Sequence, residues 1–149
     1  MAQISYLTQD IFATDCVALV NPVNCVGVMG KGLALAFKNW YYDNYLAYHK
    51  ACKENLVHLG KMFFYPREEL PYWIVNFPTK HHWKDKSRLE DIECGLIALS
   101  YWLSEKKIPS IAIPPLGCGL GGLDKKDVYP LIAHHLGKIP NLLIKVVEI

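Results

Sequence analysis

Short apolar runs alternate with longer segments of helical periodicity along the chain. Val17–Val20 is continuously apolar, as expected for a strand that is covered on both faces, and Ser110–Ile113 is a second run of this kind. The other predicted strands are Gln3–Leu7, Lys61–Tyr65, Tyr72–Phe77 and Leu142–Val147. Strands that alternate with helices indicate an α/β fold with a sheet between helical layers, in which the later strands are parallel.

The clearest predicted helix follows Ser87. Ser87 and Glu90 fit the capping-box pattern S-x-x-E, so we expect Ser87 at the N-cap, and Pro109 marks the exit. Between them, apolar residues recur at steps of three and four, at Leu89, Ile92, Leu96, Leu99 and Leu103. Further helices are predicted from Leu33–Phe37, over Asp43–Lys53, and from Asp127 to about Leu136 with Gly137 as the closing residue.

The composition fits one globular domain. The chain has 149 residues, of which 52% are hydrophobic and 20% charged, enough to bury a core without disulfides. A net charge of +2 excludes a histone-like binder but permits a local basic patch. The five cysteines form no C-x-x-C pair, so we expect a reducing, cytoplasmic location without a metal site. The sequence shows no signal-peptide pattern and no membrane-length apolar run, so no membrane partner is expected.

Two glycine-containing loops follow predicted strands. They are NPVNCVGVMGKGL at residues 21–33 and PPLGCGLGG at residues 114–122. Glycines after a strand let backbone N–H groups approach a phosphate closely, and a nearby helix start favours negative charge. In an open α/β sheet both loops lie at the carboxyl ends of strands, where ligands bind. Either loop alone is equally well explained as a tight turn, but the pair favours a site for a nucleotide diphosphate.

Two familiar nucleotide-binding motifs do not fit these loops. Gly117, Gly119 and Gly122 match G-x-G-x-x-G, the dinucleotide fingerprint. Too few residues follow Gly122 to build the second half of that fold, and Gly137 stands where an acidic residue is required. The segment GVMGKGLA (27–34) fails the P-loop pattern, because two residues rather than four separate its first glycines and glycine follows its lysine. We therefore expect no nicotinamide cofactor, and no other cofactor is predicted.

Three segments resemble the binding segments of macrodomains, the ADP-ribose-binding family. They are QDIF, VNPVN…GKGLALAF and IAIPPLGCGLGG, in matching order and spacing from about residue 7 to the end. The stretch NFPTKHHWKDKSRLEDIECGL (76–96) is more specific, and it is similar to the DarG family of antitoxins, which remove ADP-ribose from DNA modified by a DarT toxin. The resemblance implies a three-layer α/β/α macrodomain with a mixed, mostly parallel central sheet.

The same resemblance implies which residues bind ADP-ribose. They are Gln9, Asp10 and Ile11 at the adenine, Asn21 and Asn24 at the distal ribose, Gly30, Lys31, Gly32 and Leu33 around that ribose and the phosphates, Gly117, Cys118, Gly119, Leu120 and Gly121 at the diphosphate, and Thr79 and Lys80 at the anomeric carbon. Residue chemistry leaves alternatives open. Asp10 also suits a helix N-cap, Asn24 a turn and Lys31 a solvated surface position. A nucleophilic Cys118 is disfavoured, because no histidine is placed beside it in sequence.

Lys80 is the residue to which the resemblance assigns catalysis. It follows a predicted strand that Pro78 ends, and by position alone it suits an ordinary surface lysine. Two roles stay open: a neutral amine that attacks the anomeric carbon, or a charged group that stabilises the departing base. Related lysine-using hydrolases of ADP-ribosylated protein carry an aspartate where Gly121 stands here. Its absence favours a nucleobase leaving group over a protein ester.

Residues 80–88, KHHWKDKSR, form the one basic and aromatic cluster. Trp83 is predicted to stack on an unpaired base while Lys84, Lys86 and Arg88 bind DNA phosphates. The alternative is a solvated loop that leads into the following helix.

The sequence therefore predicts a hydrolase that removes ADP-ribose from a nucleobase of single-stranded DNA. The alternatives are a hydrolase of ADP-ribosylated protein and a macrodomain that binds ADP-ribose without turnover. The resemblance implies ADP-ribose, ADP-ribosylated single-stranded DNA and a cognate DarT-like toxin as partners. It also leads us to expect that residues 1–149 are the N-terminal domain of a longer antitoxin, and it leaves open which base is modified.

Overall fold

A six-stranded sheet in the order β1-β6-β5-β2-β4-β3 organises the chain. In this computed structural model, which describes residues 1–148, β1, β6, β5, β2 and β4 run parallel to one another. β3 pairs antiparallel with β4 at one edge. The strands are β1 (Gln3–Thr8), β2 (Ala18–Val23), β3 (Phe63–Pro66), β4 (Trp73–Pro78), β5 (Ser110–Ile113) and β6 (Leu143–Glu148). The predicted mixed, mostly parallel sheet is confirmed.

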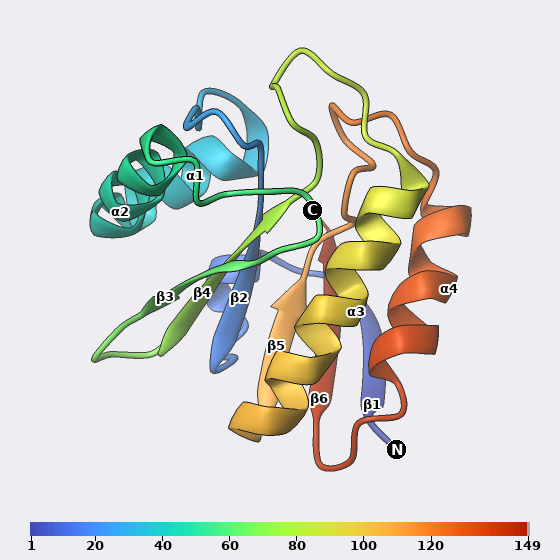
Figure 1. Cartoon of the computed structure of the whole chain (residues 1–149). Helices are drawn as coiled ribbons and strands as arrows, with labels where there is room; N and C mark the ends of the chain where they lie inside the picture. The colour runs from blue at the N-terminus through green and yellow to red at the C-terminus, as the bar shows by residue number, and fades with distance from the viewer. Residues whose placement is uncertain (149) are drawn as a thin grey trace.

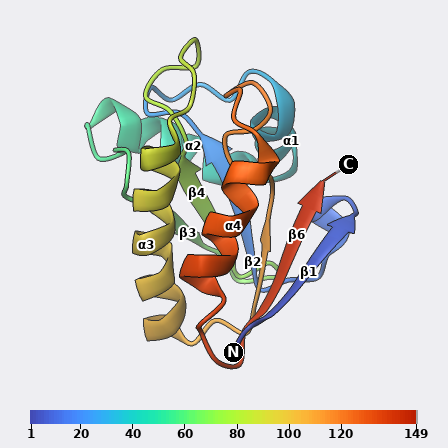
Figure 2. The same cartoon turned by 90° about the vertical axis from the view of Figure 1, so that its right-hand side faces the viewer.

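Helices cover both faces of this sheet, as Figures 1 and 2 show. The long helix α3 (Leu89–Lys106) lies beside α4 (Lys125–Leu136) on one face. On the other face lie the short 3-10 helix η1 (Ile11–Ala13) and α1 (Gly32–Trp40), from which α2 (Tyr42–Lys53) continues toward β3. The three-layer arrangement expected from the sequence is therefore confirmed.

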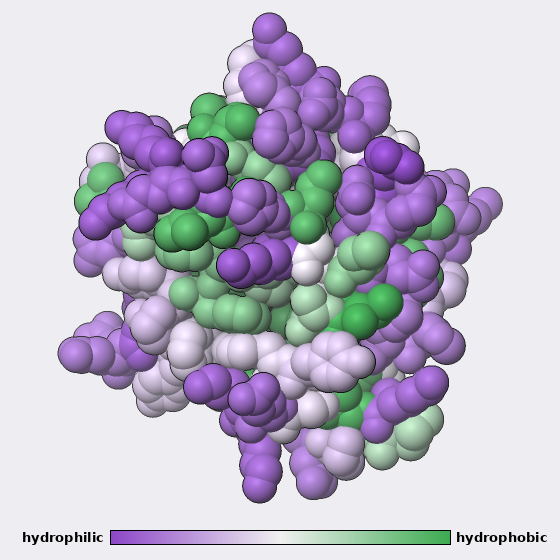
Figure 3. Space-filling view, in the orientation of Figure 1, coloured by the Kyte–Doolittle hydropathy of each residue, from purple (hydrophilic) through white to green (hydrophobic). Residues whose placement is uncertain are grey.

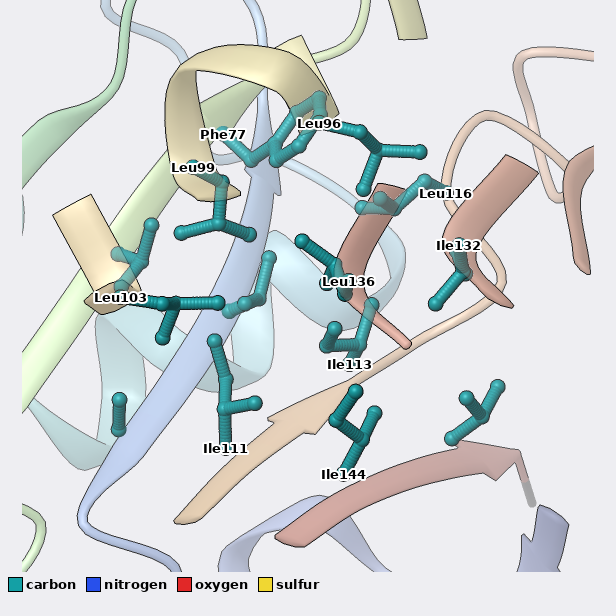
Figure 4. Close-up of a cluster of buried hydrophobic side chains, with 14 of the residues drawn as sticks. Phe77, Leu96, Leu99, Leu103, Ile111, Ile113, Leu116, Ile132, Leu136 and Ile144 are labelled. Atoms are coloured by element: carbon teal, nitrogen blue, oxygen red, sulfur yellow. The ribbon is translucent and has the colours of Figure 1, made fainter. Parts of the chain in front are cut away.

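Alternate residues of the central strands enter the two layers. Ala18 and Val20 of β2 belong to the apolar cluster beneath α3 and α4, whereas Leu19 belongs to the cluster beneath α1. Figure 4 shows the first cluster, with Leu99 of α3 and Ile144 of β6 among its labelled side chains. Because both faces are covered, the strands are apolar at nearly every position, which is why they were visible in the sequence.

Gly95 allows α3 to lie close to β4. A Cβ atom at this position would come 2.5 Å from Cε1 of Phe77, which is fully buried near the end of β4. The close approach of helix and strand holds the carboxyl end of β4 in place. This end leads directly into the loop that contains Lys80.

The predicted start of α3 is wrong. Arg88, not Ser87, is the N-cap residue, and no side chain caps the helix. The backbone N–H of Ser87 instead donates a hydrogen bond of 2.9 Å to the carbonyl of Gly121. Ser87 is drawn into packing with a distant loop, and this tertiary contact replaces the local capping box.

The last helix also begins earlier than predicted. It starts at Lys125 rather than Asp127, because the Asp124 carboxylate accepts a hydrogen bond of 2.9 Å from the Lys126 N–H and caps the helix there. Gly137 is the C-cap residue, as expected.

The loops of interest leave the carboxyl ends of β1, β2, β4 and β5 and gather at one end of the sheet (Figure 1). We call residues 24–31 the Asn24 loop, residues 79–88 the Lys80 loop and residues 114–124 the glycine loop. Within residues 1–148, no helix is both long and apolar enough to cross a membrane, and no group of three or more His, Cys, Asp or Glu side chains is arranged to hold a metal ion.

Candidate functional site

The Lys80 loop is fixed against the Asn24 loop by hydrogen bonds that extend the β2–β4 pairing. The Thr79 N–H donates to the Val23 carbonyl at 2.9 Å, and the Cys25 N–H donates to the His81 carbonyl at 2.8 Å. The Cys25 thiol also contacts the Lys80 carbonyl at 3.7 Å. Lys80 is therefore held by its neighbours on both sides, at the end of a buried strand, which the resemblance alone did not explain.

The other end of the Lys80 loop is joined to the glycine loop through the bond from Ser87 to Gly121. Ser87 is buried, and its hydroxyl has no hydrogen-bond partner within residues 1–148. A Cβ atom at Gly121 would collide with this hydroxyl oxygen and would come 2.5 Å from the carbonyl oxygen of Gly117. A side chain at position 121 therefore requires the backbone of this loop to shift.

The glycine loop presents consecutive backbone donors. Its own backbone hydrogen bonds run from the Leu123 N–H to the Gly117 carbonyl (2.9 Å), from the Gly122 N–H to the Gly119 carbonyl (3.2 Å) and from the Cys118 N–H to the Pro115 carbonyl (3.1 Å). In the part of the chain that the structure describes, the N–H groups of Gly119, Leu120 and Gly121 have no acceptor. Successive unpaired N–H groups in a loop suit an anion such as a phosphate.

The Asn24 side chain shapes its own loop. Its Oδ1 accepts hydrogen bonds from the Val26 N–H (3.0 Å) and the Tyr48 hydroxyl (2.8 Å), and its Nδ2 donates to the Val28 carbonyl at 2.8 Å. The turn role that the sequence left open is thus present, and the predicted ribose contact stays a prediction. The loop delivers Gly30, Lys31, Gly32 and Leu33 to the start of α1, where Lys31 is the N-cap without a side-chain cap. The N–H groups of this first turn suit an anion as well.

Asn21 lies beneath this loop and is fully buried. Its Nδ2 donates to Oδ1 of Asn76 at 3.1 Å, while its own Oδ1 has no partner among the described residues. Asn76 and Asn44 exchange two further hydrogen bonds of 2.8 and 3.1 Å. Asn44 and Asn76 were missed from the sequence, although an asparagine inside the apolar strand β4 was a usable signal. The predicted contact of Asn21 with the ribose remains a prediction.

Asp10 caps η1. Its Oδ1 accepts a hydrogen bond of 3.0 Å from the Phe12 N–H, so the capping alternative is present. The Asp10 carboxylate is nevertheless exposed, and Gln9 and the buried Ile11 flank it. A carboxylate with one capped oxygen keeps acceptor capacity for an adenine amino group.

Lys80 is half-buried, and its environment disfavours the charged form. Burial lowers the pKa of its amine below the ordinary value, the positive charge of Lys86 lowers this pKa further, and Asp85 opposes both. Thr79 beside it is buried, with its hydroxyl 3.4 Å from the Val23 carbonyl. A lysine with a lowered pKa is better supplied with the neutral amine that nucleophilic attack needs.

The environment of Cys118, unlike that of Lys80, disfavours the nucleophilic form of its side chain. Burial raises the pKa of its thiol, and Sγ contacts the Leu116 carbonyl at 3.6 Å. A thiol that is harder to ionise is a poor nucleophile, which agrees with the sequence-based judgement.

The remaining predicted DNA contacts lie on the exposed side of the Lys80 loop, whose surface is hydrophilic in Figure 3. Trp83 is 46% exposed, and the Lys84 ammonium lies 5.1 Å from the centre of its ring. Arg88 pairs with Glu90 at 2.9 Å, and both side chains are exposed. Trp83 is thus accessible for stacking, whereas Arg88 must exchange Glu90 for any phosphate.

Two cavities of about 330 and 570 Å³ adjoin one another, and neither is lined by residues of the Asn24, Lys80 or glycine loops. Trp40, Tyr41 and Arg67 line both, between α1 and the β3–β4 turn. Of the predicted site residues, Ile11 lines the smaller one. The candidate site is therefore defined by donors on three exposed loops and not by these cavities.

Comparison with known proteins identifies the class. The family model of the Macro domain matches residues 20–132, and the chain belongs to the macrodomain family. Among solved structures, the macrodomain of Thermus aquaticus DarG is similar to it with a TM-score of 0.95 and 42% identity over 100% of both chains. The expected resemblance to DarG macrodomains is confirmed.

Two longer relatives add functional names. A Mycobacterium tuberculosis protein named DNA ADP-ribosyl glycohydrolase is 48% identical over 141 residues, 93% of this chain and 40% of the relative. A Thermosipho africanus fusion of DNA ADP-ribosyl transferase and glycohydrolase is 37% identical over 91% of this chain and 39% of its own length. The structure of Thermosipho africanus DarTG in complex with ADP-ribose matches with a TM-score of 0.92 and 36% identity, over 99% of this chain and 42% of that one. The chain spans about 40% of the length of the curated relatives that it matches.

Proposed function

We propose that this macrodomain is a DNA ADP-ribosyl glycohydrolase that removes ADP-ribose from a nucleobase of single-stranded DNA. The observation that carries the proposal is the position of Lys80, on a loop whose ends are bonded to the two loops that offer phosphate-binding N–H groups. The names of the similar proteins from Mycobacterium tuberculosis and Thermosipho africanus support the same activity. In this proposal the chain acts in the cytoplasm as the antitoxin to a DarT-like DNA ADP-ribosyltransferase.

The proposed contacts follow the three loops. The N–H groups of Gly119, Leu120 and Gly121 bind one part of the diphosphate, and the first turn of α1 binds the other. Asp10 accepts from the adenine amino group. With the diphosphate held there, the distal ribose lies toward the Lys80 loop, and Trp83 stacks on a base of the DNA strand.

Two alternative reaction routes are open to Lys80 in this proposal. In the first, the neutral amine of Lys80 attacks the anomeric carbon, the N-glycosidic bond breaks, and its electron pair leaves on the base nitrogen. Loss of the amine proton and opening of the ribose then give a Schiff base, which water hydrolyses to ADP-ribose and free lysine. In the second, Lys80 stays protonated and stabilises the leaving base while water attacks the oxocarbenium-like centre.

The leading alternative substrate is ADP-ribosylated protein. A protein ester leaves as a carboxylate, and the lysine-using hydrolases that it resembles add an aspartate at the position of Gly121. Because a side chain at Gly121 collides with Ser87 and the Gly117 carbonyl, this loop holds that carboxylate only after a shift of its backbone. Gly121 therefore supports a nucleobase substrate.

One experiment tests the proposal. The protein is incubated with ADP-ribosylated single-stranded DNA and, separately, with ADP-ribosylated protein, and release is followed by chromatography. We expect release from DNA, its loss in Lys80→Ala, and wild-type release in Lys50→Ala, a control lysine exposed on α2. Borohydride added during turnover links ADP-ribose to Lys80 in the Schiff-base route and to nothing in the other route. Binding of both substrates without release would leave a protein that only binds ADP-ribose.

A further inference from the structure

Lys86 lies across the glycine loop. A Cβ atom at Gly122 would be 3.4 Å from Cδ of Lys86 and 3.7 Å from its Nζ. The next residue, Ser87, is bonded through its N–H to the Gly121 carbonyl, so the backbone of Lys86 is tied to the same loop. The aliphatic part of Lys86 therefore packs on the glycine backbone, and its ammonium group stays beside that loop.

The surroundings of this ammonium group suit an anionic ligand. The unpaired N–H groups of Gly119, Leu120 and Gly121 belong to the same loop. None of the ion pairs found within residues 1–148 includes Lys86. Nearby acidic residues have other partners: Asp85 accepts from the His82 N–H, and Glu90 pairs with Arg88. In the glycine loop, Asp124 accepts from the Lys126 N–H.

Lys86 also acts on Lys80 through its charge. After burial, the charge of Lys86 is the main cause that lowers the pKa of Lys80, and Asp85 on the same loop opposes it. From the Asn24 loop, the Cys25 thiol faces the Lys80 carbonyl, and burial raises the pKa of this thiol to about 11, so it carries no charge near neutral pH. Two like charges beside one another favour the neutral form of one of them.

A bound diphosphate would reverse this advantage. Its negative charge favours the protonated form of a nearby amine, and so opposes the neutral Lys80 that attack requires. A cation that pairs with the diphosphate offsets part of this effect. Lys86 lies beside the glycine loop, and its charge lowers the pKa of Lys80. It can therefore pair with the diphosphate and favour the neutral form of Lys80.

We propose that Lys86 is a second functional lysine of this site, which binds the diphosphate of the ADP-ribosyl group rather than the phosphates of the DNA strand, and thereby keeps Lys80 available for the reaction. The proposal rests on the proposed function of the same site. It replaces the strand contact that the sequence predicted for Lys86, while the neighbouring Lys84, whose ammonium lies near the Trp83 ring, keeps that assignment.

The test compares Lys86→Ala and Lys86→Arg with Lys84→Ala on two substrates. One is an ADP-ribosylated oligonucleotide, and the other is a single nucleoside that carries ADP-ribose on its base and has no strand. Lys86→Ala is expected to lower kcat/KM on both substrates by about tenfold, the loss of one charged hydrogen bond. It should also move the acid limb of the kcat profile to higher pH, and Lys86→Arg should restore both quantities. Lys84→Ala should affect the oligonucleotide more than the nucleoside.

A second measurement does not depend on turnover. Calorimetric titration with ADP-ribose and with adenosine should show that Lys86→Ala weakens ADP-ribose binding by about tenfold and leaves adenosine binding unchanged. If Lys86→Ala loses activity on the oligonucleotide alone, with an unchanged pH profile and unchanged ADP-ribose affinity, Lys86 contacts the strand and the inference is wrong. If the wild-type protein releases ADP-ribose from neither substrate, the proposed function fails, and the titrations alone decide the role of Lys86.

Discussion

Gly121→Ala offers the sharpest test of how the glycine loop is built. The new Cβ atom would come 2.5 Å from the Gly117 carbonyl oxygen and closer still to the Ser87 hydroxyl. Neither neighbour is the end of a long flexible side chain, so backbone must shift. The matched control is Gly119→Ala in the same loop, because a Cβ atom there meets nothing within 4 Å.

The size of the effect follows from overpacking. Forcing a methyl group into a packed position costs about 1–3 kcal/mol. For a domain of this length, that loss corresponds to a Tm lower by roughly 2–12 °C. Ser87→Ala removes a buried hydroxyl that has no partner within residues 1–148, so alone it is expected to be neutral or slightly stabilising.

Thermal and urea unfolding of four variants measure these terms. We expect Gly121→Ala to lower Tm by several degrees, Gly119→Ala to stay near wild type, and Ser87→Ala/Gly121→Ala to recover part of the loss. The recovery is the coupling energy of the double-mutant cycle, and it stays incomplete because the Gly117 carbonyl remains. Equal Tm values for Gly121→Ala and Gly119→Ala, or a cycle without coupling, would refute the steric explanation of Gly121.

Three further predictions follow from single side chains. Because the fold lowers the pKa of Lys80, the unfolded chain binds that proton more tightly, so the contribution of Lys80 to stability rises as pH approaches the ordinary value of 10.5 from below. Thiols with a pKa raised by burial, such as Cys25, act in the opposite direction, so the difference between wild type and Lys80→Met is the quantity to measure. In urea unfolding this difference should shift in favour of the wild type between pH 8 and pH 10, and a difference that does not change with pH would contradict the lowered pKa. Glu90→Gln should change stability by less than about 1 kcal/mol, since its pair with Arg88 is exposed, and should strengthen single-stranded DNA binding in a filter assay, where weaker binding would contradict it. At neutral pH, iodoacetamide should modify the exposed Cys94 well before Cys118, whose pKa is raised by burial; mass spectrometry of the early product shows the order, and preferential labelling of Cys118 would contradict a protonated thiol.

The sequence predicted the layers and most strands because each strand is covered on both faces. Val20 and Ile111, for example, lie in continuous apolar runs and are fully buried beneath α3 and α4. It also placed both glycine loops correctly at the ends of strands, since parallel strands end at one edge of a sheet. Strands and the loops at their ends depend on the residue pattern within one segment, so they can be predicted from that segment alone.

The hydrogen-bond partners of individual polar side chains could not be predicted from the sequence. An N-cap at Ser87 would stabilise the helix by about 1 kcal/mol. In the fold, Ser87 is instead hydrogen-bonded to the distant Gly121. The exchange between Asn44 and Asn76 joins a helix to a strand, and nothing in either segment specifies the other. Lys86 looked like Lys84 in the sequence, and only the packing of its aliphatic part on Gly122 separates the two.

The Ser87–Gly121 contact links the shape of the loop to the chemistry proposed for it. The same residue that is bonded to the glycine loop fills the space that an aspartate at position 121 would need. An aspartate introduced by Gly121→Asp would therefore displace Ser87 or the Gly117 carbonyl, and the loop would change shape with it. Besides Ser87, the polar side chain of the Lys80 loop that lies beside the glycine loop is that of Lys86. A site of this composition suits a leaving group that departs as a stabilised anion, as an imide nitrogen of a nucleobase does, better than one that requires a general base.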